Sequence, residues 1–518
     1  MSLAKRSAIA IGFIAALTGA EVRAEGNEDA EIAALKRQLQ LLESKLDKLQ
    51  KQANARPPAA PKASPPGPYA AMPVKGPAPP PEAIVLMPNN RPTICTYDQQ
   101  NCIAITSRIH YDIGGYDYHP NTPSTVPQRL DDGTNLRRAR IGVTGKFLGD
   151  WNYALIYDFG GSSDGFGGTA SVNGAAVGFL PGGGVSGVEN AYLSYTGLKP
   201  FGGKLAVEAG VMDVMWSLDE SNSSNDIPFM ERSSSQVIAT NIAANDFRSA
   251  VGGRWYNDVF WAGAYATGPT TGAIHSASSI NPPGTTEQLG AVARVAGQVI
   301  SGKDYSLHIG AGAEWLINPP HNLVANTQTL TLSDRPELRI DPTAIVSTGA
   351  MAGVSGAQVY AAEAAATWGP LYLQGEYFWI NVDRKFLPNL PSVNFQGGYA
   401  EAAFVLTGES RAYQPASSSY GGVIPKDPFS LTGGGWGAWE IAARFSTIDL
   451  NDQLAQANGV AGGRQTVYTA ALNWYVNRNV RFMLDYLHGN ITKQLSPTNF
   501  TDVGAKFDAV AMRTQVAF

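Results

Sequence analysis

The sequence predicts an all-β protein, a transmembrane antiparallel β-barrel, from its strand pattern, its composition and an export signal. Residues 507–518 read FDAVAMRTQVAF, with apolar side chains on one face and Arg513 and Gln515 on the other. Because successive side chains of a strand point to opposite faces, this segment suits a sheet with lipid on one side and water on the other. A soluble β-sandwich also alternates, but segment ends rich in aromatic residues favour the barrel.

The composition agrees with a barrel. The 518 residues include 56 glycines and 10% aromatic residues, while only 16% are charged. This mixture fits a barrel that keeps its polar groups inside and does not fit a disordered chain. The formal net charge is -5 at pH 7, so no general basic surface for nucleic acid is expected.

The N-terminus predicts export. Lys5 and Arg6 precede an apolar run at 8–17, and small residues up to Ala24 offer a cleavage site. The run is too short to span a bilayer comfortably, and the pattern is that of a signal peptide over residues 1–24. Export of a barrel predicts the outer membrane, with outer-membrane lipid as a partner and the region before the barrel in the periplasm.

Residues 25–53 are predicted to form a coiled-coil helix, and residues 54–92, which are rich in proline, an extended periplasmic linker. The apolar positions of the helix alternate in spacing between three and four: Ile32, Leu35, Leu39, Leu42, Leu46 and Leu49. Such a repeat requires partner helices. Because about three heptads are marginal on their own, the barrels would have to hold the helices together. The alternative is a lone amphipathic helix that lies on a surface.

Residues 93–134 are predicted as an N-terminal segment that carries Cys95 and Cys102. In an exported protein an isolated pair of cysteines usually forms a disulfide. Metal binding is less favoured, because the loop between them contains no histidine. The first strand begins either near residues 103–111 or at residue 135, and the barrel is assigned to residues 135–518.

Residues 135–147 show how the lumen is predicted. Arg138, Arg140 and Lys146 share one face, apolar residues share the other, and a short turn follows at 148–150. A charge that faced the bilayer core would cost several kcal/mol, so the polar face is expected to line the pore. The same parity places further arginines there: Arg248, Arg254, Arg294, Arg444, Arg481 and Arg513. Carboxylates of the same strands nearly cancel this charge. The varied segment 216–247 is the candidate for a loop that folds into the pore.

Catalysis is not expected. Ser163 lies in a GSSDG stretch like a nucleophile elbow, but a glycine-rich loop follows where that motif needs a helix. His308 faces the lumen by parity and is interpreted as a pore-lining polar residue. Zinc-protease and P-loop motifs do not occur in the sequence. We therefore predict no catalytic residue, no metal and no cofactor, with an outer-membrane hydrolase that uses Ser163 or His308 as the alternative class.

Several motifs in one order resemble the phosphate-selective porins O and P of Gram-negative outer membranes. They are GTNLRRARIGVTG, DIPFMERS, LSDRPELRID, AWEIAARFSTIDLND and GGRQTVYTAALNWYVNRNVRFMLDYLHG, and the similarity runs from about residue 133 to residue 518. The resemblance implies a barrel of 16 strands that assembles as a homotrimer, each barrel with its own channel. It also implies transport of anions or phosphate.

The expected function is passive diffusion of small anions through a water-filled porin, with phosphate and polyphosphate as candidate solutes. Arg138, Arg140 and Lys146 are the candidate anion contacts. The alternative for these three is that they pair with acidic residues and brace the barrel wall. The alternative for the whole protein is a general, weakly selective porin whose coiled coil also tethers the outer membrane to the cell wall.

Overall fold

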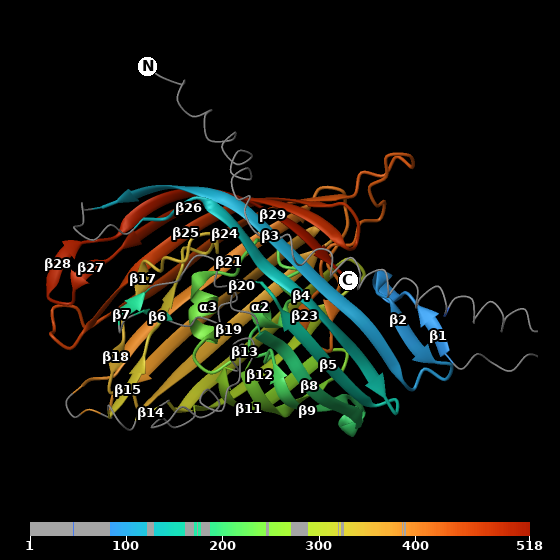
Figure 1. Cartoon of the computed structure of the whole chain (residues 1–518), viewed down its shortest axis with the longest axis horizontal. Coiled ribbons are helices and arrows are strands. Elements are labelled where there is room, and N and C mark those ends of the chain that lie inside the picture. Colours follow the sequence, from blue (N-terminus) through green and yellow to red (C-terminus); the bar gives the residue numbers. More distant parts are fainter. Residues whose placement is uncertain are drawn as a thin grey trace, which may run out of the picture. The chain divides into compact units, whose positions relative to one another are not determined.

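The computed structural model describes residues 45, 83–121, 129–160, 170–172, 175–177, 187–244, 248–270, 288–319, 321–322, 326–385, 387 and 390–518. The predicted signal peptide (1–24) and coiled coil (25–53) lie outside the described residues, apart from Lys45, which is helical and exposed. Most of the predicted linker also lies outside them. The second of the two units into which the chain divides, Pro80–Phe518, contains the β-barrel (Figure 1).

Sixteen strands of the described residues form a closed antiparallel barrel, as the fold class predicted. Each pairs with the next in chain order, and the last pairs with the first. They are β3 (Cys102–Pro120), β4 (Gly133–Phe147), β5 (Trp151–Asp158), β8 (Gly187–Leu198), β9 (Lys204–Met212), β10 (Arg248–Tyr256), β11 (Phe260–Thr270), β12 (Leu289–Ser301), β13 (Tyr305–Asn318), β19 (Gly356–Trp368), β20 (Leu371–Asp383), β21 (Val393–Val405), β24 (Ala438–Asp452), β25 (Val460–Tyr475), β26 (Val480–Thr492) and β29 (Ala505–Ala517).

The barrel closes between β29 and β3. The terminal residue Phe518 exchanges two backbone hydrogen bonds with Ser107, at 2.9 and 3.0 Å. Along β29 the outward side chains Val510 and Met512 are 53% and 46% exposed, whereas Arg513 on the inner face is fully buried. The predicted alternation between an apolar outer face and a polar inner face is therefore confirmed for this strand.

The barrel begins earlier than the predicted boundary at residue 135. β3 is its first strand, which was the earlier of the two predicted starts. The predicted linker also ends too late, because β1 (Ala83–Leu86) lies inside it and pairs with β2 (Thr93–Thr96). β2 in turn pairs with the start of β3, where Cys95 faces Cys102 in register and forms a disulfide with it.

The two ends of the barrel differ. At one end the connections are short, for example the turn 148–150, where Leu148 and Gly149 both have positive φ (50° and 78°), as a tight hairpin requires. The connection 406–437 is the exception at this end. Long connections lie at the other end and carry small strands: β6 (Ala170–Val172), β7 (Ala175–Val177), β14 (His321–Asn322), β15 (Thr327–Leu330), β16 (Ser333–Asp334), β17 (Val346–Ser347), β18 (Met351–Ala352), β27 (Gln494–Ser496) and β28 (Asn499–Asp502).

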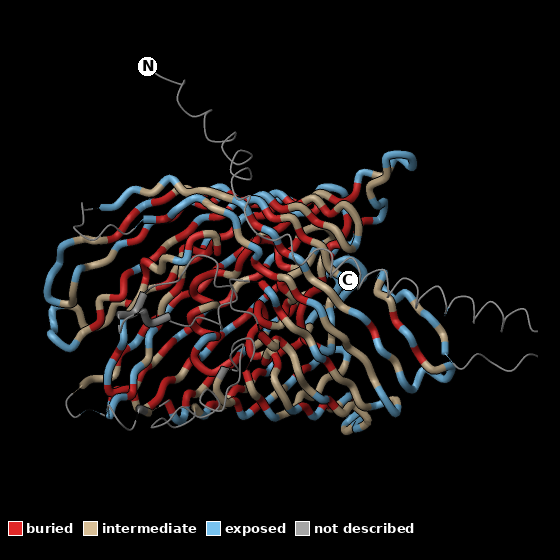
Figure 2. Tube along the Cα trace, viewed as in Figure 1, coloured by how far each residue is buried: buried red, intermediate tan, exposed pale blue. Residues whose placement is uncertain are grey.

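The described part of the connection 213–247, residues 213–244, folds into the barrel, where it forms α2 (Leu218–Ser221) and α3 (Ser234–Thr240) (Figure 1). Ser217 and Ser233 cap these helices by accepting hydrogen bonds from backbone N–H groups three residues on. Trp216 packs on Phe378 of the wall, with the ring centroids 5.8 Å apart. Figure 2 shows that most of this inner region is buried. The described residues of the segment predicted to enter the pore, 216–244, therefore do so.

The connection 406–437 enters the barrel from the short-turn end. It forms β22 (Tyr413–Gln414) and β23 (Ser419–Tyr420) inside the wall. The backbone N–H of Tyr420 donates to Asn222 Oδ1 (2.9 Å), so this connection meets the loop 213–247 in the interior. Among the described residues, the helices lack the length and apolarity needed to cross a bilayer.

Candidate functional site

A cluster of arginines lines the wall formed by β3 and β4. Arg138 and Arg140 lie on the inner face, as predicted, and Arg137 joins them because a β-bulge lies between the pairs His110–Arg138 and Tyr111–Leu136. A bulge adds one residue to a strand and so reverses the alternation beyond it. Strict alternation along this strand therefore missed Arg137, which is buried.

Arg137 and Arg138 lie beside one carboxylate of the inner loop, Glu231, together with Arg513 of β29 and Arg339. Arg137 Nε and Arg513 Nη2 donate to Glu231 Oε1 at 2.9 and 2.6 Å, and Arg138 and Arg339 each lie 3.9 Å from the carboxylate. Burial raises the pKa of this carboxyl, but the guanidiniums outweigh it and hold the pKa of Glu231 well below its usual range. The cluster fixes the loop 213–247 to the wall.

The other arginines predicted to line the pore also contact neighbouring groups. Arg140 binds Asp158 (2.8 Å) and Glu189; Arg254 binds Glu208 (2.6 Å); Arg294 binds Glu363 (2.7 Å); Arg444 binds Glu337 (2.8 Å); Arg248 donates to the carbonyls of Ala244 and Gly268; and Arg481 donates to the carbonyl of Ile227 (2.8 Å). Lys146 lies near the short-turn end of β4 and is partly exposed. Most of these cations therefore brace the wall or hold the inner connections.

Wall carboxylates hold the inner loop in the complementary way. Glu376 accepts hydrogen bonds from the backbone N–H groups of Leu218 and Asp219, at 2.8 and 3.1 Å. Asp485 accepts from the N–H of Met230 at 2.9 Å. Because buried backbone donors and acceptors both need partners, a loop that crosses the lumen requires wall groups of both signs.

Of the two candidate catalytic residues, the structure describes His308. His308 is fully buried, with Nε2 2.9 Å from Glu363 Oε1 and Nδ1 3.3 Å from the hydroxyl of Tyr413. Glu363 is also bound to Arg294, so His308 belongs to a packed network that holds β22. Ser163 lies outside the described residues.

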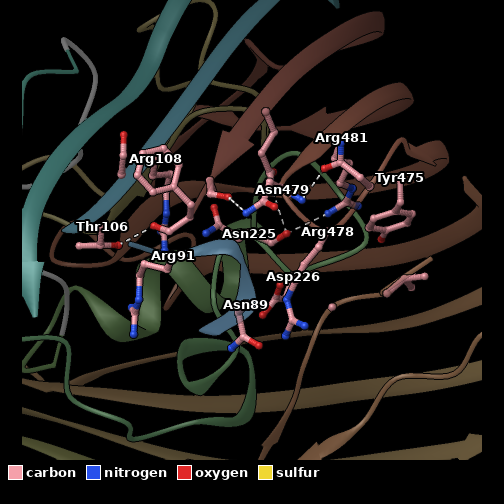
Figure 3. A pocket seen from close by; sticks show the side chains of 17 residues that line it. Asn89, Arg91, Thr106, Arg108, Asn225, Asp226, Tyr475, Arg478, Asn479 and Arg481 are labelled. Carbon is pink, nitrogen blue, oxygen red and sulfur yellow. Dashed lines mark hydrogen bonds between the residues drawn. The ribbon is translucent and has the colours of Figure 1, made fainter. Parts of the chain in front are cut away.

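A chamber of about 400 Å³ opens at the short-turn end, and we call it the mouth chamber (Figure 3). Its lining brings together segments that are far apart in the sequence. Arg91 precedes β2, Arg108 lies on β3, Arg478 lies in the turn after β25, and Arg481 lies on β26. The acidic residue of the lining is Asp226, from the inner loop. Four arginines and one acidic side chain therefore line the chamber.

The lining residues differ in how firmly they are held. Arg108 donates to the hydroxyls of Ser224 and Ser223, at 2.7 and 3.2 Å, and so fixes the inner loop. Arg478 is exposed and Arg91 is half-buried. Burial raises the pKa of Asp226 above its ordinary value, although Arg411 and Arg108 nearby and a backbone hydrogen bond from Gly422 oppose this. The chamber can attract anions, and its net charge depends on the protonation of Asp226.

Comparison with known proteins decides the family. The sequence profile of a family described as phosphate-selective porin O and P matches residues 103–518. The chain belongs to the phosphate-selective porin O and P family. In barrels of this outer-membrane kind the short turns face the periplasm and the long loops face the exterior, so the mouth chamber lies at the periplasmic end of this porin.

Two relatives resemble the porin over most of its length. An uncharacterized protein of Caulobacter vibrioides is 28% identical over 475 residues, covering 88% of this chain and 83% of the relative. Porin O of Pseudomonas aeruginosa is 23% identical over 460 residues, covering 82% and 90%. The solved structure of OmpT, an outer membrane protein of Vibrio cholerae, superposes with a TM-score of 0.44 at 11% identity, covering 81% of this chain and 98% of that one.

Three arginines of the mouth chamber were missed by reasoning from the sequence. Arg91 lies in a stretch interpreted as linker, and Arg478 lies in a turn, where strand parity does not apply. Arg108 lies on β3, and the sequence did not decide whether the barrel starts at this strand or at residue 135. The alternation of Arg108 with Ile109 and Tyr111 was the available signal for an inward side chain.

Proposed function

We propose that this porin forms a water-filled channel for the passive diffusion of small anions, with phosphate or polyphosphate among them. The observation that carries the proposal is the mouth chamber, which is lined by four arginines and one aspartate. Guanidiniums replace part of an anion's hydration shell, and a nearby carboxylate keeps binding weak enough for release. The description of the family supports phosphate as the solute to test first.

The proposed anion contacts divide into two groups. Arg140 binds the carboxylates of Asp158 and Glu189, and Arg138 lies 3.9 Å from that of Glu231, which supports the bracing role that the sequence left open for them. Lys146, which is partly exposed, stays a candidate contact together with Arg91 and Arg478. We also propose a homotrimer, which the predicted heptads of residues 25–53 support.

Removing Arg91 and Arg478 should reduce the preference for anions about fivefold, since each charge acts over several ångströms of water that salt partly screens. The measurement is the reversal potential of the double variant Arg91→Ala/Arg478→Ala in a planar bilayer under a salt gradient. Lys303→Ala removes an exposed cation from another turn at the same end and should change little. Equal reversal potentials in the double variant and the wild type would overturn the role of the mouth chamber.

The same recordings, repeated with phosphate added to chloride, test the solute. Low phosphate should reduce the chloride current in the wild type and reduce it less in the double variant. A large chloride current that phosphate does not reduce, in the wild type and in the double variant alike, would instead identify a general porin.

Acidification should increase the preference for anions about twofold between about pH 7 and about pH 4, because Asp226 loses its charge. The sign follows from the raised pKa of Asp226: the carboxyl takes up a proton at a higher pH than an ordinary aspartate, which leaves Arg108 and Arg481 less compensated. Reversal potentials across this pH range check it. The variant Asp226→Asn should have, at every pH, the stronger preference for anions that the wild type has at acidic pH. A pH response that persists in this variant would assign the titration to another group.

A further inference from the structure

The connection 406–437 does not end inside the barrel. Its first part, which contains β22 and β23, lies in the lumen, whereas residues 424–437 present large apolar side chains to the surroundings. Leu431 is 90% exposed and Trp436 is 72% exposed. Such exposure at the periplasmic end of a membrane barrel requires an explanation, because the other connections of this end are short turns.

Phe429 and Trp436 attach residues 424–437 to the outer face of the wall. Trp474 Nε1 donates to the carbonyl of Trp436 at 2.9 Å, and the rings of Phe429 and Trp474 meet edge to face with centroids 5.3 Å apart. Trp474 alternates along β25 with the buried Asn473 and Tyr475 and therefore points outward. It stacks between Trp439 of β24 and Phe482 of β26, at 5.4 and 5.7 Å.

The exposed tip is held in a defined conformation. The N–H of Phe429 donates to the carbonyl of Val476 (2.7 Å), that of Ser430 to Gly435 (3.1 Å), and that of Gly437 to Asp427 (3.0 Å). Gly434 and Gly437 supply the positive φ values, 77° and 71°, that close the turn. Leu431 and Trp436 are therefore presented by a built turn.

We propose that residues 424–437 form a membrane anchor that inserts Leu431 and Trp436 into the phospholipid leaflet on the periplasmic side. The anchor continues a row of outward aromatic residues, and aromatic side chains at the edge of a barrel mark the interface between bilayer and water. Lys426 and Asp427 are both exposed, and together they suit the paired charges of a zwitterionic headgroup.

The anchor joins the membrane to the pore within one connection. Gly422 and Val423, directly before it, line the mouth chamber. A methyl group added at Gly422 would meet the carboxylate of Asp226 at 2.5 Å, so this part packs closely on the inner loop. Seating residues 424–437 in the leaflet positions residues 411–423 at the periplasmic mouth.

The test places a fluorescent probe at the tip. The full-length variant Leu431→Cys is labelled with an environment-sensitive dye and reconstituted into vesicles of phosphatidylethanolamine and phosphatidylglycerol. The chain has two cysteines, and both are in the disulfide, so the new thiol is the single reactive one. Leu495→Cys on β27 is the matched control, because Leu495 is also exposed (59%) and lies in a loop at the other end.

An interfacial segment is buried about 5–10 Å deep, so lipids with a shallow nitroxide should quench the dye at position 431 about threefold more than at position 495. Iodide in the buffer should quench them in the opposite order. Two results would overturn the anchor: iodide quenching at position 431 as strong as at 495, or protection from both quenchers, which would place Leu431 against a second copy of the chain. The readout does not depend on which ions the pore conducts.

Discussion

Replacing Glu231 with glutamine should destabilise the barrel by about 3–5 kcal/mol, because the change removes one partner of a buried ion cluster. Glu231 is 5% exposed and is the carboxylate that Arg137 and Arg513 share, with Arg138 and Arg339 close by. Glutamine has about the same size but cannot balance these guanidiniums. The measurement is the free energy of unfolding of the protein in detergent. Guanidinium chloride is the denaturant, and tryptophan fluorescence reports the unfolding.

The same change should alter the acid sensitivity of the porin. The pKa of Glu231 in the folded protein lies well below its usual range. A depressed pKa contributes stability that is present above the unfolded value, about 4.3, and is lost as the pH falls through the folded value. The wild type should therefore lose stability in acid, whereas Glu231→Gln should lack this part of the loss.

A control separates the cluster from a general effect of charge. Asp258→Asn removes an exposed carboxylate from a short turn, and its unfolding free energy should stay within about 0.5 kcal/mol of the wild type. If Glu231→Gln unfolds like this control, the cluster does not hold the inner loop. In a planar bilayer, a released loop should also appear as larger and noisier conductance.

The wall of the barrel was predictable from the residues, because it depends on a local rule. In β29 the alternation of Val510 and Met512 with Arg513 separates the lipid face from the lumen, and the structure has that arrangement. The rule fails where the strand geometry changes. Arg137 and Glu189 are both buried at bulges, and nothing in the sequence alone marks where a strand gains one residue.

The pairing of the lumen charges was less predictable. The strand alternation predicts that Arg444 and Glu376 lie on the inner face. It does not predict their partners, which belong to inner loops distant from them in the sequence. Arg444 donates to the carbonyl of Glu231 and Glu376 accepts from Leu218. The near balance of signs in the lumen therefore reflects a loop backbone with both donors and acceptors to satisfy, which is a tertiary property.

The periplasmic connection 406–437 was missed for a related reason. Its sequence lacks the periodicity of a helix or a strand. A barrel of this kind also usually has short turns at the periplasmic end. The two halves have opposite environments: Tyr420 packs in the lumen and Leu431 faces outward. The half in the lumen is held by the buried side chain of Arg411, which binds Glu440 and the backbone carbonyl of Asp226, and the pattern of the sequence carries no signal for these contacts.

Arg411→Met should release residues 411–423 from the lumen and cost about 3–5 kcal/mol of stability, since a buried carboxylate loses its cation. Arg411 Nη2 donates to Glu440 Oε1 at 2.7 Å and to the hydroxyl of Tyr475 at 3.3 Å, and its guanidinium lies 5.2 Å from the ring centre of Tyr372. It also donates to the carbonyl of Asp226. The conductance should rise, because the segment no longer narrows the periplasmic mouth.

A double-mutant cycle tests whether the charge pair is the cause. Glu440 keeps hydrogen bonds from Asn473 (3.0 Å) and Tyr475 (2.7 Å), so Glu440→Gln can remain hydrogen-bonded in the absence of Arg411. The double variant Arg411→Met/Glu440→Gln should therefore be more stable than Arg411→Met alone, while its conductance stays raised because the contact with Asp226 is still lost. If the two substitutions simply add in free energy, the ion pair does not hold the connection. If the conductance of both variants equals that of the wild type, residues 411–423 do not limit the pore.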